Sequence, residues 1–444
     1  MPDLVPARWT STEPSSLDLL RNTPINCLLI EQPQWSSAFN AEAVKRGVSV
    51  LAVIRPSADS VATARRAAQM QFGGAVLEGA FDPNAREQIR RLLDDSKLMA
   101  VELPPRSQMR FDSKDAIIGT GQGLWPGVQE HADEHKAAPS GAAWIDTNTG
   151  FLRFARASTR STIWLANSPP PGTVLAVERY LQAIGDAAMT GARWVISFDD
   201  QTNRKLHERD AATIAGWKRI AKTLQYYEDH KNWREAEPFA RLALIENASS
   251  GALLSGGILD MIAVKHTPVR PVPPQGLDQK VISGVNLAVN VDPEALSAEQ
   301  REVLKAFTRS GGTLLTGPPG WKFPTPRLGQ ITLEKDDLSK LDEIWRELNA
   351  MTGRKNLGAR LFNVSTMLSN LLETRDHSQI ILQLVNYSDY SVENVTVHVL
   401  GQYKSARLLR PDGDPKTVTG YEIEEGTGFD IDQVGSVATL VLTR

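Results

Sequence analysis

The chain has 444 residues, of which 41% are hydrophobic and 23% are charged, as is ordinary for a globular protein. Its 49 Lys and Arg residues nearly balance its 52 Asp and Glu residues, which excludes a dominant basic surface for nucleic acid or anionic lipid. The single cysteine, Cys27, excludes an internal disulfide and a Cys-rich metal site. No apolar run reaches the ~20 residues of a membrane-spanning helix. We expect no cofactor, no resident metal, and neither nucleic acid nor membrane as a partner.

The first twenty residues, MPDLVPARWTSTEPSSLDLL, are polar and contain several prolines. They lack the basic start and the apolar stretch of a signal peptide. The predicted localisation is therefore secreted or periplasmic if a leader has been removed, and cytoplasmic otherwise.

Between residues 25 and 229, short apolar runs alternate with amphipathic helices such as 83–96 and 211–229. Such runs are typical of parallel strands buried on both faces, with the helices as crossovers. Eight strand–helix units predict a (β/α)8 TIM barrel. The rival, an open doubly wound sheet, often has a Gly-rich first turn, whereas the turn EQPQWSSAF here has no glycine. The predicted strands are 25–31, 48–54, 74–79, 98–103, 116–121, 141–146, 161–167 and 192–199.

The carboxyl ends of barrel strands are where the chemistry of this fold lies. Most of the predicted ends carry an ionisable or amide group, and two tryptophans near them offer flat faces of the kind that stack on sugar rings. The alternative for each Asp or Asn is that it only caps the next helix. The groups are Glu31, Arg55, Glu78, Glu102, Asp146, Asn167, Asp199 and Asp200, with Trp125 and Trp144 as the aromatic residues.

Residues 239–336 form a second pattern of strands and helices, which predicts a small doubly wound α/β domain. Its clearest helix is 297–312, where Ser297 is the N-cap, Gln300 completes a capping box and a Gly-Gly pair ends the helix. After a helix at 337–353, the remaining strands alternate with period two and predict an antiparallel β-sandwich.

Two stretches carry a resemblance to a known family. They are LSAEQREVLKAFTRSGGTLLTG (296–317) and ILQLVNYSDYSVENVTVHVLGQYKSARLLRPDG (381–413). Together with the order of the domains they resemble the multidomain glycoside hydrolases of the bacterial beta-galactosidase type. There, a catalytic barrel precedes an amidotransferase-like trimerisation domain and a β-sandwich. The resemblance implies domains at 1–238, 239–336 and 337–444, a carbohydrate substrate, and a homo-oligomer formed through the middle domain.

The predicted barrel departs from this family at the catalytic positions. Retaining members carry Asn-Glu at the end of strand four and a second Glu at the end of strand seven. Counted from residue 25, strand four ends at Glu102 without the Asn, and strand seven ends at Asn167 without a carboxylate. The family's pair cannot be carried over.

Our hypothesis is a glycoside hydrolase whose catalytic carboxylates are a non-standard pair, Glu102 and Asp146. Asp199 is the alternative catalytic carboxylate. The mechanism needs two carboxyl groups roughly 5–10 Å apart, one protonated and one ionised. Arg55 and Asn167 would position the substrate. Glu78 would be the partner of Arg55, and Trp125, Trp144 and Asp200 would complete the binding site.

Two other classes stay open. A catalytically inactive barrel would bind carbohydrate or assemble a complex, and would pair its carboxylates with Arg or Lys. A metal-dependent barrel could use His207 with Asp199 and Asp200. His131 and His135 have the spacing of one helix face, although the pattern favours a solvated polar helix over a metal site.

Overall fold

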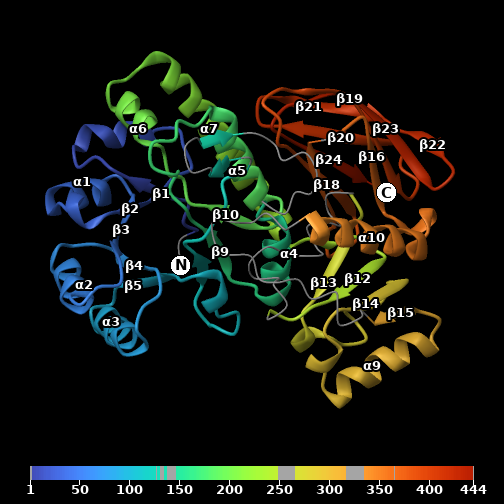
Figure 1. Ribbon diagram of the computed structural model, residues 1–444. Coiled ribbons are helices and arrows are strands. Elements are labelled where there is room, and N and C mark those ends of the chain that lie inside the picture. The colour runs from blue at the N-terminus through green and yellow to red at the C-terminus, as the bar shows by residue number, and fades with distance from the viewer. Residues whose placement is uncertain are drawn as a thin grey trace. The chain divides into compact units, whose positions relative to one another are not determined.

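The computed structural model describes residues 3–126, 147–248, 266–316, 335–364 and 366–443, and the backbone of 128–130 and 135–137 (Figure 1). The chain divides into two units. Unit 1 consists of Met1–Trp125, Arg160–Tyr180 and Ala192–Asp229, and unit 2 of Pro126–Thr159, Leu181–Gly191 and His230–Arg444.

Unit 1 contains two parallel sheets. The five-stranded sheet runs in sequence order through β1 (Pro6–Trp9), β2 (Cys27–Ile30), β3 (Ser49–Ile54), β4 (Gly74–Glu78) and β5 (Met99–Leu103). The three-stranded sheet has the order β10 (Ala192–Trp194), β9 (Thr162–Leu165) and β6 (Ile117–Thr120). One isolated parallel bridge joins Ala7 of β1 to Ile196, just after β10.

Alternate residues of both sheets pack into a single apolar cluster, which includes Leu29, Val53, Val76, Val101 and Trp164. Helices α1 (Ser37–Lys45), α2 (Ser60–Gln69) and α3 (Pro83–Asp95) contact the first sheet (Figure 1). After β10 come α6 (Asp200–His207) and α7 (Ala211–Asp229). Side chains alternate between the two sides of a strand. The cluster therefore determines on which side of its sheet each side chain at a strand end lies.

Unit 2 begins with the hairpin β7 (Val128–Glu130) and β8 (His135–Ala137), and with helix α4 (Thr149–Ser158). Helix α5 (Val177–Ala188) contributes its residues from Leu181 onward. A parallel sheet follows, with the order β13 (Val269–Val272), β12 (Leu242–Ile245), β14 (Leu287–Asn290) and β15 (Thr313–Thr316). Helix α9 (Ala298–Arg309) starts with the predicted capping box of Ser297 and Gln300, which is confirmed.

Unit 2 ends with two antiparallel sheets, preceded by α10 (Lys335–Thr352). Their facing sides form one apolar core that includes Leu382, Val397, Phe429 and Leu440. The first sheet has the order β11 (Glu237–Pro238), β17 (Met367–Glu373), β18 (Gln379–Asn386), β24 (Val437–Thr443), β20 (Ser405–Arg410) and β21 (Gly413–Thr419). The second has the order β16 (Ala359–Phe362), β19 (Val392–Leu400), β23 (Gly426–Val434) and β22 (Tyr421–Ile423).

The mixed α/β architecture with parallel sheets and an antiparallel C-terminal part is confirmed. Strand β1 was not predicted, because its four residues include a proline and an arginine. The interpretation of His131 and His135 as one helix face is wrong, since His135 lies in β8. The predicted strand at 141–146 lies outside the described residues.

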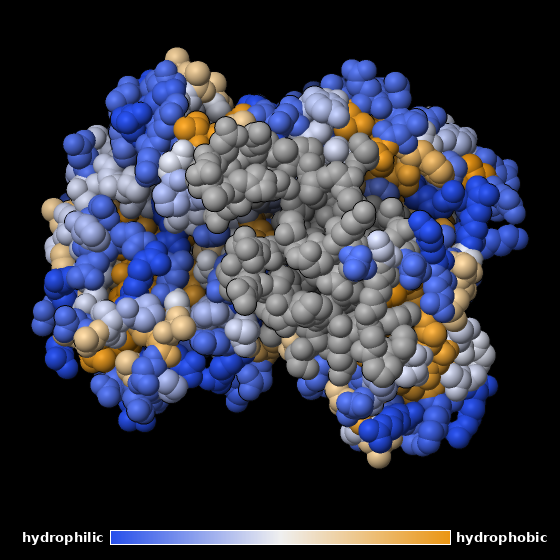
Figure 2. Space-filling view, viewed as in Figure 1, coloured by the Kyte–Doolittle hydropathy of each residue, from blue (hydrophilic) through white to orange (hydrophobic). Residues whose placement is uncertain are grey.

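Hydrophilic residues predominate over the described part of the face shown in Figure 2. The large hydrophobic side chains recorded as exposed are Val44, Val174, Met351, Tyr390 and Tyr421. Among the described helices, none is both long and apolar enough to cross a bilayer.

Candidate active site at the strand ends of unit 1

Four charged side chains meet at the carboxyl ends of four consecutive strands of unit 1. Arg8 lies on β1, Glu31 directly follows β2, Arg55 directly follows β3 and Glu78 ends β4. Arg8 Nη1 donates to Glu31 Oε1 at 2.8 Å, and Arg8 Nη2 donates to Glu78 Oε1. Arg55 Nη2 lies 2.8 Å from Glu31 Oε1 and 3.1 Å from Glu78 Oε2. Each carboxylate therefore contacts both guanidinium groups, and the predicted pairing of Glu78 with Arg55 is confirmed.

This cluster has a buried floor and an accessible rim. The side chains of Arg8 and Glu78 are each 8% exposed, whereas those of Glu31 and Arg55 are 35% and 53% exposed. Burial opposes the charged form of Arg55, but the hydrogen bond to Glu31 and the charges of Glu78 and Glu31 outweigh it, so the pKa of Arg55 is raised. Solvent and ligands can reach Arg55 and Glu31 first.

The strand register explains why these four side chains converge. Val76 and Val53 belong to the shared apolar cluster, and Glu78 and Arg55 follow them two residues later on the same face. Gly121, just after β6, leaves room for the carboxylate, because a Cβ there would lie 3.0 Å from Glu78 Oε1. The cluster is thus at the carboxyl-terminal edge of the parallel strands, where parallel α/β folds bind ligands.

The structure places Glu102 on the other face of its strand. Its neighbours Val101 and Leu103 both belong to the apolar cluster, so the side chain between them points away from it. There it accepts a hydrogen bond of 2.8 Å from Arg90 of α3, which also donates to Asp115 at 2.8 Å. The hydrogen bond from Arg90 is the main reason that the pKa of Asp115 is lowered. Glu102 is not brought together with Glu78.

Asp199 is buried and caps helix α6. Its carboxylate accepts from the Thr202 backbone N–H at 2.9 Å, the Thr202 hydroxyl at 2.7 Å and the Tyr180 hydroxyl at 2.7 Å. Burial, as the largest cause, raises the pKa of the Tyr180 hydroxyl. Asp200 is the first residue of the helix that Asp199 caps.

The remaining predicted residues have mixed outcomes. Asn167 donates from Nδ2 to the Gly123 carbonyl at 2.7 Å. Trp125 is only 5% exposed and packs edge-on against Trp194 at 4.8 Å between ring centroids, so its faces lie within the protein. Asp146 and Trp144 lie outside the described residues. No group of three His, Cys, Asp or Glu side chains that could hold a metal ion occurs in the described part of the chain.

Sequence reasoning did not identify Arg8. The available signal was a lone arginine inside a short, otherwise apolar stretch, VPARW. A buried arginine requires carboxylate partners, and the acidic strand ends at Glu31 and Glu78 supply them.

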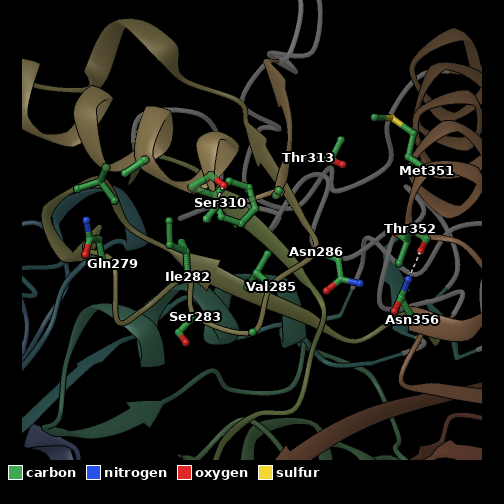
Figure 3. Close-up of a pocket in the computed structure, with 16 residues that line it drawn as sticks. Gln279, Ile282, Ser283, Val285, Asn286, Ser310, Thr313, Met351, Thr352 and Asn356 are labelled. Carbon is green, nitrogen blue, oxygen red and sulfur yellow. Dashed lines mark hydrogen bonds between the residues drawn. The ribbon is translucent and has the colours of Figure 1, made fainter.

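Unit 2 contains a separate pocket of about 750 Å³ (Figure 3). It lies beside the residues that precede or begin β14 and β15, such as Val285, Asn286 and Thr313, and also beside Met351 of α10. Its lining contains no charged side chain among the described residues. The pocket is at the amino ends of the strands, opposite to the edge that usually binds ligands in such sheets. The cluster in unit 1 is therefore the stronger candidate site.

No sequence-family profile matches this chain, and no curated protein matches it in sequence. Solved structures do match its fold. Alpha-L-fucosidase isoenzyme 2 from Paenibacillus thiaminolyticus aligns with a TM-score of 0.65 at 10% identity, over 99% of each chain. A GH42 beta-galactosidase from G. stearothermophilus aligns with a TM-score of 0.57 at 10% identity, over 99% of this chain and 98% of that one. The cold-adapted beta-galactosidase from Rahnella sp. R3 aligns with a TM-score of 0.54 at 9% identity, with the same coverage. The predicted resemblance to multidomain glycoside hydrolases is confirmed at the level of the fold.

Proposed function

We propose that this protein is a glycoside hydrolase, and that its two parallel sheets in unit 1 form a closed (β/α)8 barrel with the active site at the carboxyl-terminal mouth. Two contacts support closure. Arg8 N–H donates to the Ile196 carbonyl at 2.7 Å, which links β1 to the chain after β10. At the other junction, the Thr120 hydroxyl at the end of β6 donates at 2.7 Å to the carbonyl of Pro104, the residue after β5.

In this barrel β1 is the first strand, so each predicted strand from 25–31 to 116–121 takes a number one higher than predicted. Strand β6 pairs directly with β9, which therefore stays strand seven, and the eight strands are complete without the predicted strand at 141–146. Glu78 then ends strand four, the position where the beta-galactosidase type that the chain resembles carries a catalytic Glu. Leu77 stands in place of the Asn of that pair. Strand seven is β9, which is followed by Asn167 and has no carboxylate at its end.

The single observation that carries the proposal is the buried Glu78 carboxylate, facing the mouth between two guanidinium groups. Contact with positive charge on both sides is a setting that suits a nucleophile or a group that stabilises an oxocarbenium-like transition state. Glu31 contacts the same two guanidinium groups. Asp146 lies outside the described residues and stays the proton donor predicted from sequence, whereas Glu102 and Asp199 have structural roles.

Turnover of a panel of nitrophenyl glycosides, including β-galactoside and α-L-fucoside, tests this assignment. The wild type should hydrolyse at least one of them, and Glu78→Gln and Asp146→Asn should each lower kcat by about 100-fold or more. The matched control is Glu102→Gln, which should retain wild-type turnover. Thermal unfolding of each variant separates catalytic loss from misfolding. Wild-type turnover in Glu78→Gln would rule out the assignment.

A second candidate function is carbohydrate binding without hydrolysis. The observation that favours it is the pairing of both Glu31 and Glu78 with arginines, which occupies the described carboxylates of the cluster. In that case no glycoside would be hydrolysed, while calorimetry would detect a sugar that binds the wild type. Arg55→Ala, which removes the most exposed member of the cluster, would weaken that binding.

A further inference from the structure

The outer face of the sheet β16–β19–β23–β22 in unit 2 carries an ordered set of side chains. The inner face of this sheet packs into the sandwich core through residues such as Val397 and Phe429. On the opposite face, the strand register aligns two rows across the strands. One row is Arg360, His398, Gly428 and Tyr421, and the other is Phe362, Thr396 and Asp430.

The Tyr421 ring lies close against its cross-strand partner, which is a glycine. A Cβ on Gly428 would lie 2.3 Å from Tyr421 Cε2 and 2.4 Å from Cζ, so only glycine lets the ring rest on the backbone. One ring face is thereby covered, and the residue is still 40% exposed. The Arg360 guanidinium, at the other end of the Tyr421 row, lies over the ring of Phe362 in the adjoining row, 5.0 Å from its centroid.

Polar groups surround these rings in fixed positions. Asp430 accepts from the Thr396 hydroxyl at 2.8 Å and from the Tyr421 hydroxyl at 3.2 Å, which leaves acceptor capacity on an exposed carboxylate. His398 Nδ1 is buried and has no hydrogen-bond partner among the described residues. Burial, as the largest cause, lowers the pKa of this imidazole, which lies in the first row between Arg360 and Gly428.

The charges on this face are balanced. Glu425, in the turn between β22 and β23, accepts from Arg360 at 2.7 Å and from Arg354 at 3.0 Å. There is thus no surplus of positive charge to attract a polyanion. There is also no continuous apolar groove for a hydrophobic peptide, because carboxylate, hydroxyl and imidazole groups interrupt the aromatic ones.

We propose that these two rows are a binding site for a neutral polysaccharide, which lies across the strands with a sugar ring on the exposed face of Tyr421. A pyranose has apolar C–H faces and a rim of hydroxyl groups, which matches an aromatic ring with Asp430 and His398 beside it and Arg360 at the far end of its row. None of its residues belongs to the proposed active site, so the two proposals can be tested separately.

Affinity electrophoresis of the full chain through gels with soluble polysaccharides tests the proposal. The neutral probes are xylan, arabinogalactan and barley β-glucan, and the anionic probe is alginate. At least one neutral probe should retard the wild type, and Tyr421→Ala should weaken that binding about tenfold, which corresponds to about 1.4 kcal/mol. The matched control is Tyr390→Ala, because Tyr390 is an exposed tyrosine of the same sandwich, 67% exposed and outside the rows.

A second variant, Gly428→Ala, keeps the tyrosine but displaces its ring, and it should also weaken retardation. Glu78→Gln should be retarded like the wild type, so a failure of the active-site proposal remains distinguishable. The proposal is overturned if no neutral probe retards the wild type, if alginate alone does, or if Tyr421→Ala and Tyr390→Ala behave alike. It is also overturned if sedimentation shows that Tyr421 mediates self-association and that binding is absent.

Discussion

The ends of strands β4 and β10 both carry a buried carboxylate, yet the two are held in opposite ways. Asp199, after β10, accepts hydrogen bonds from two backbone N–H groups and from two neutral hydroxyl groups, and it caps the next helix. Glu78, on β4, contacts two guanidinium groups from neighbouring strands, one of which is more than half exposed. Neutral local donors indicate a structural role, whereas convergent charges with one accessible member indicate a site.

The prediction with the largest expected effect concerns Asp199, the carboxylate with a structural role. Asp199→Ala removes a buried cap and leaves the Tyr180 hydroxyl without its acceptor, so we expect a loss of about 3–5 kcal/mol in the free energy of unfolding. The matched control is Asp82→Ala, because Asp82 is an exposed cap that accepts from the Asn84 and Ala85 N–H groups at 2.9 and 3.1 Å. That variant should lose only about 1 kcal/mol in urea unfolding. Equal losses would contradict the distinction.

Much of the fold could be predicted from local patterns. Helix 211–229 and the capping box at Ser297 and Gln300 follow from short-range rules, and both are confirmed. Strand β1 could not be predicted in this way. Its Arg8 is stabilised by Glu31 and Glu78, which lie 23 and 70 residues away, so a four-residue strand with a charge in it has no local signal.

The candidate site was only partly predictable for a related reason. Glu31, Arg55 and Glu78 were found because each follows an apolar run, but missing β1 shifted the strand count and drew attention to Glu102. The side of the sheet on which Glu102 lies was also ambiguous. Parallel strands that are covered on both sides carry apolar residues at odd and at even positions alike. Only the apolar cluster that contains Val101 and Leu103 shows that these two side chains point to the interior and that Glu102, between them, does not.

Unit 2 provides a second buried carboxylate with neutral donors, and it sharpens the comparison. Asp186 is fully buried and accepts from the Asn148 backbone N–H at 3.0 Å and from the hydroxyl of Tyr387, which is itself fully buried. Tyr387→Phe should therefore lower the free energy of unfolding by about 1–3 kcal/mol. Tyr390→Phe, at an exposed tyrosine, is the control and should change it by less than about 0.5 kcal/mol. An unchanged stability in Tyr387→Phe would show that this network does not hold the fold.

The smallest expected effect concerns Asp115, which Arg90 links to Glu102. Because the pKa of Asp115 is lowered below its ordinary 3.8, mainly by the hydrogen bond from Arg90, the folded state favours the ionised form. The pair therefore stabilises the protein above pH 3.8, and that stability disappears as the pH falls through the folded-state value. Asp115→Asn should lower the free energy of unfolding by about 1 kcal/mol at pH 7, since both partners are partly exposed, and by less at pH 3.

Asp112→Asn is the control, because Asp112 is 84% exposed and lies 3.7 Å from Arg110. Urea unfolding at the two pH values measures both variants, and a cost for Asp115→Asn that grows on acidification would mean that this carboxylate is not stabilised by Arg90.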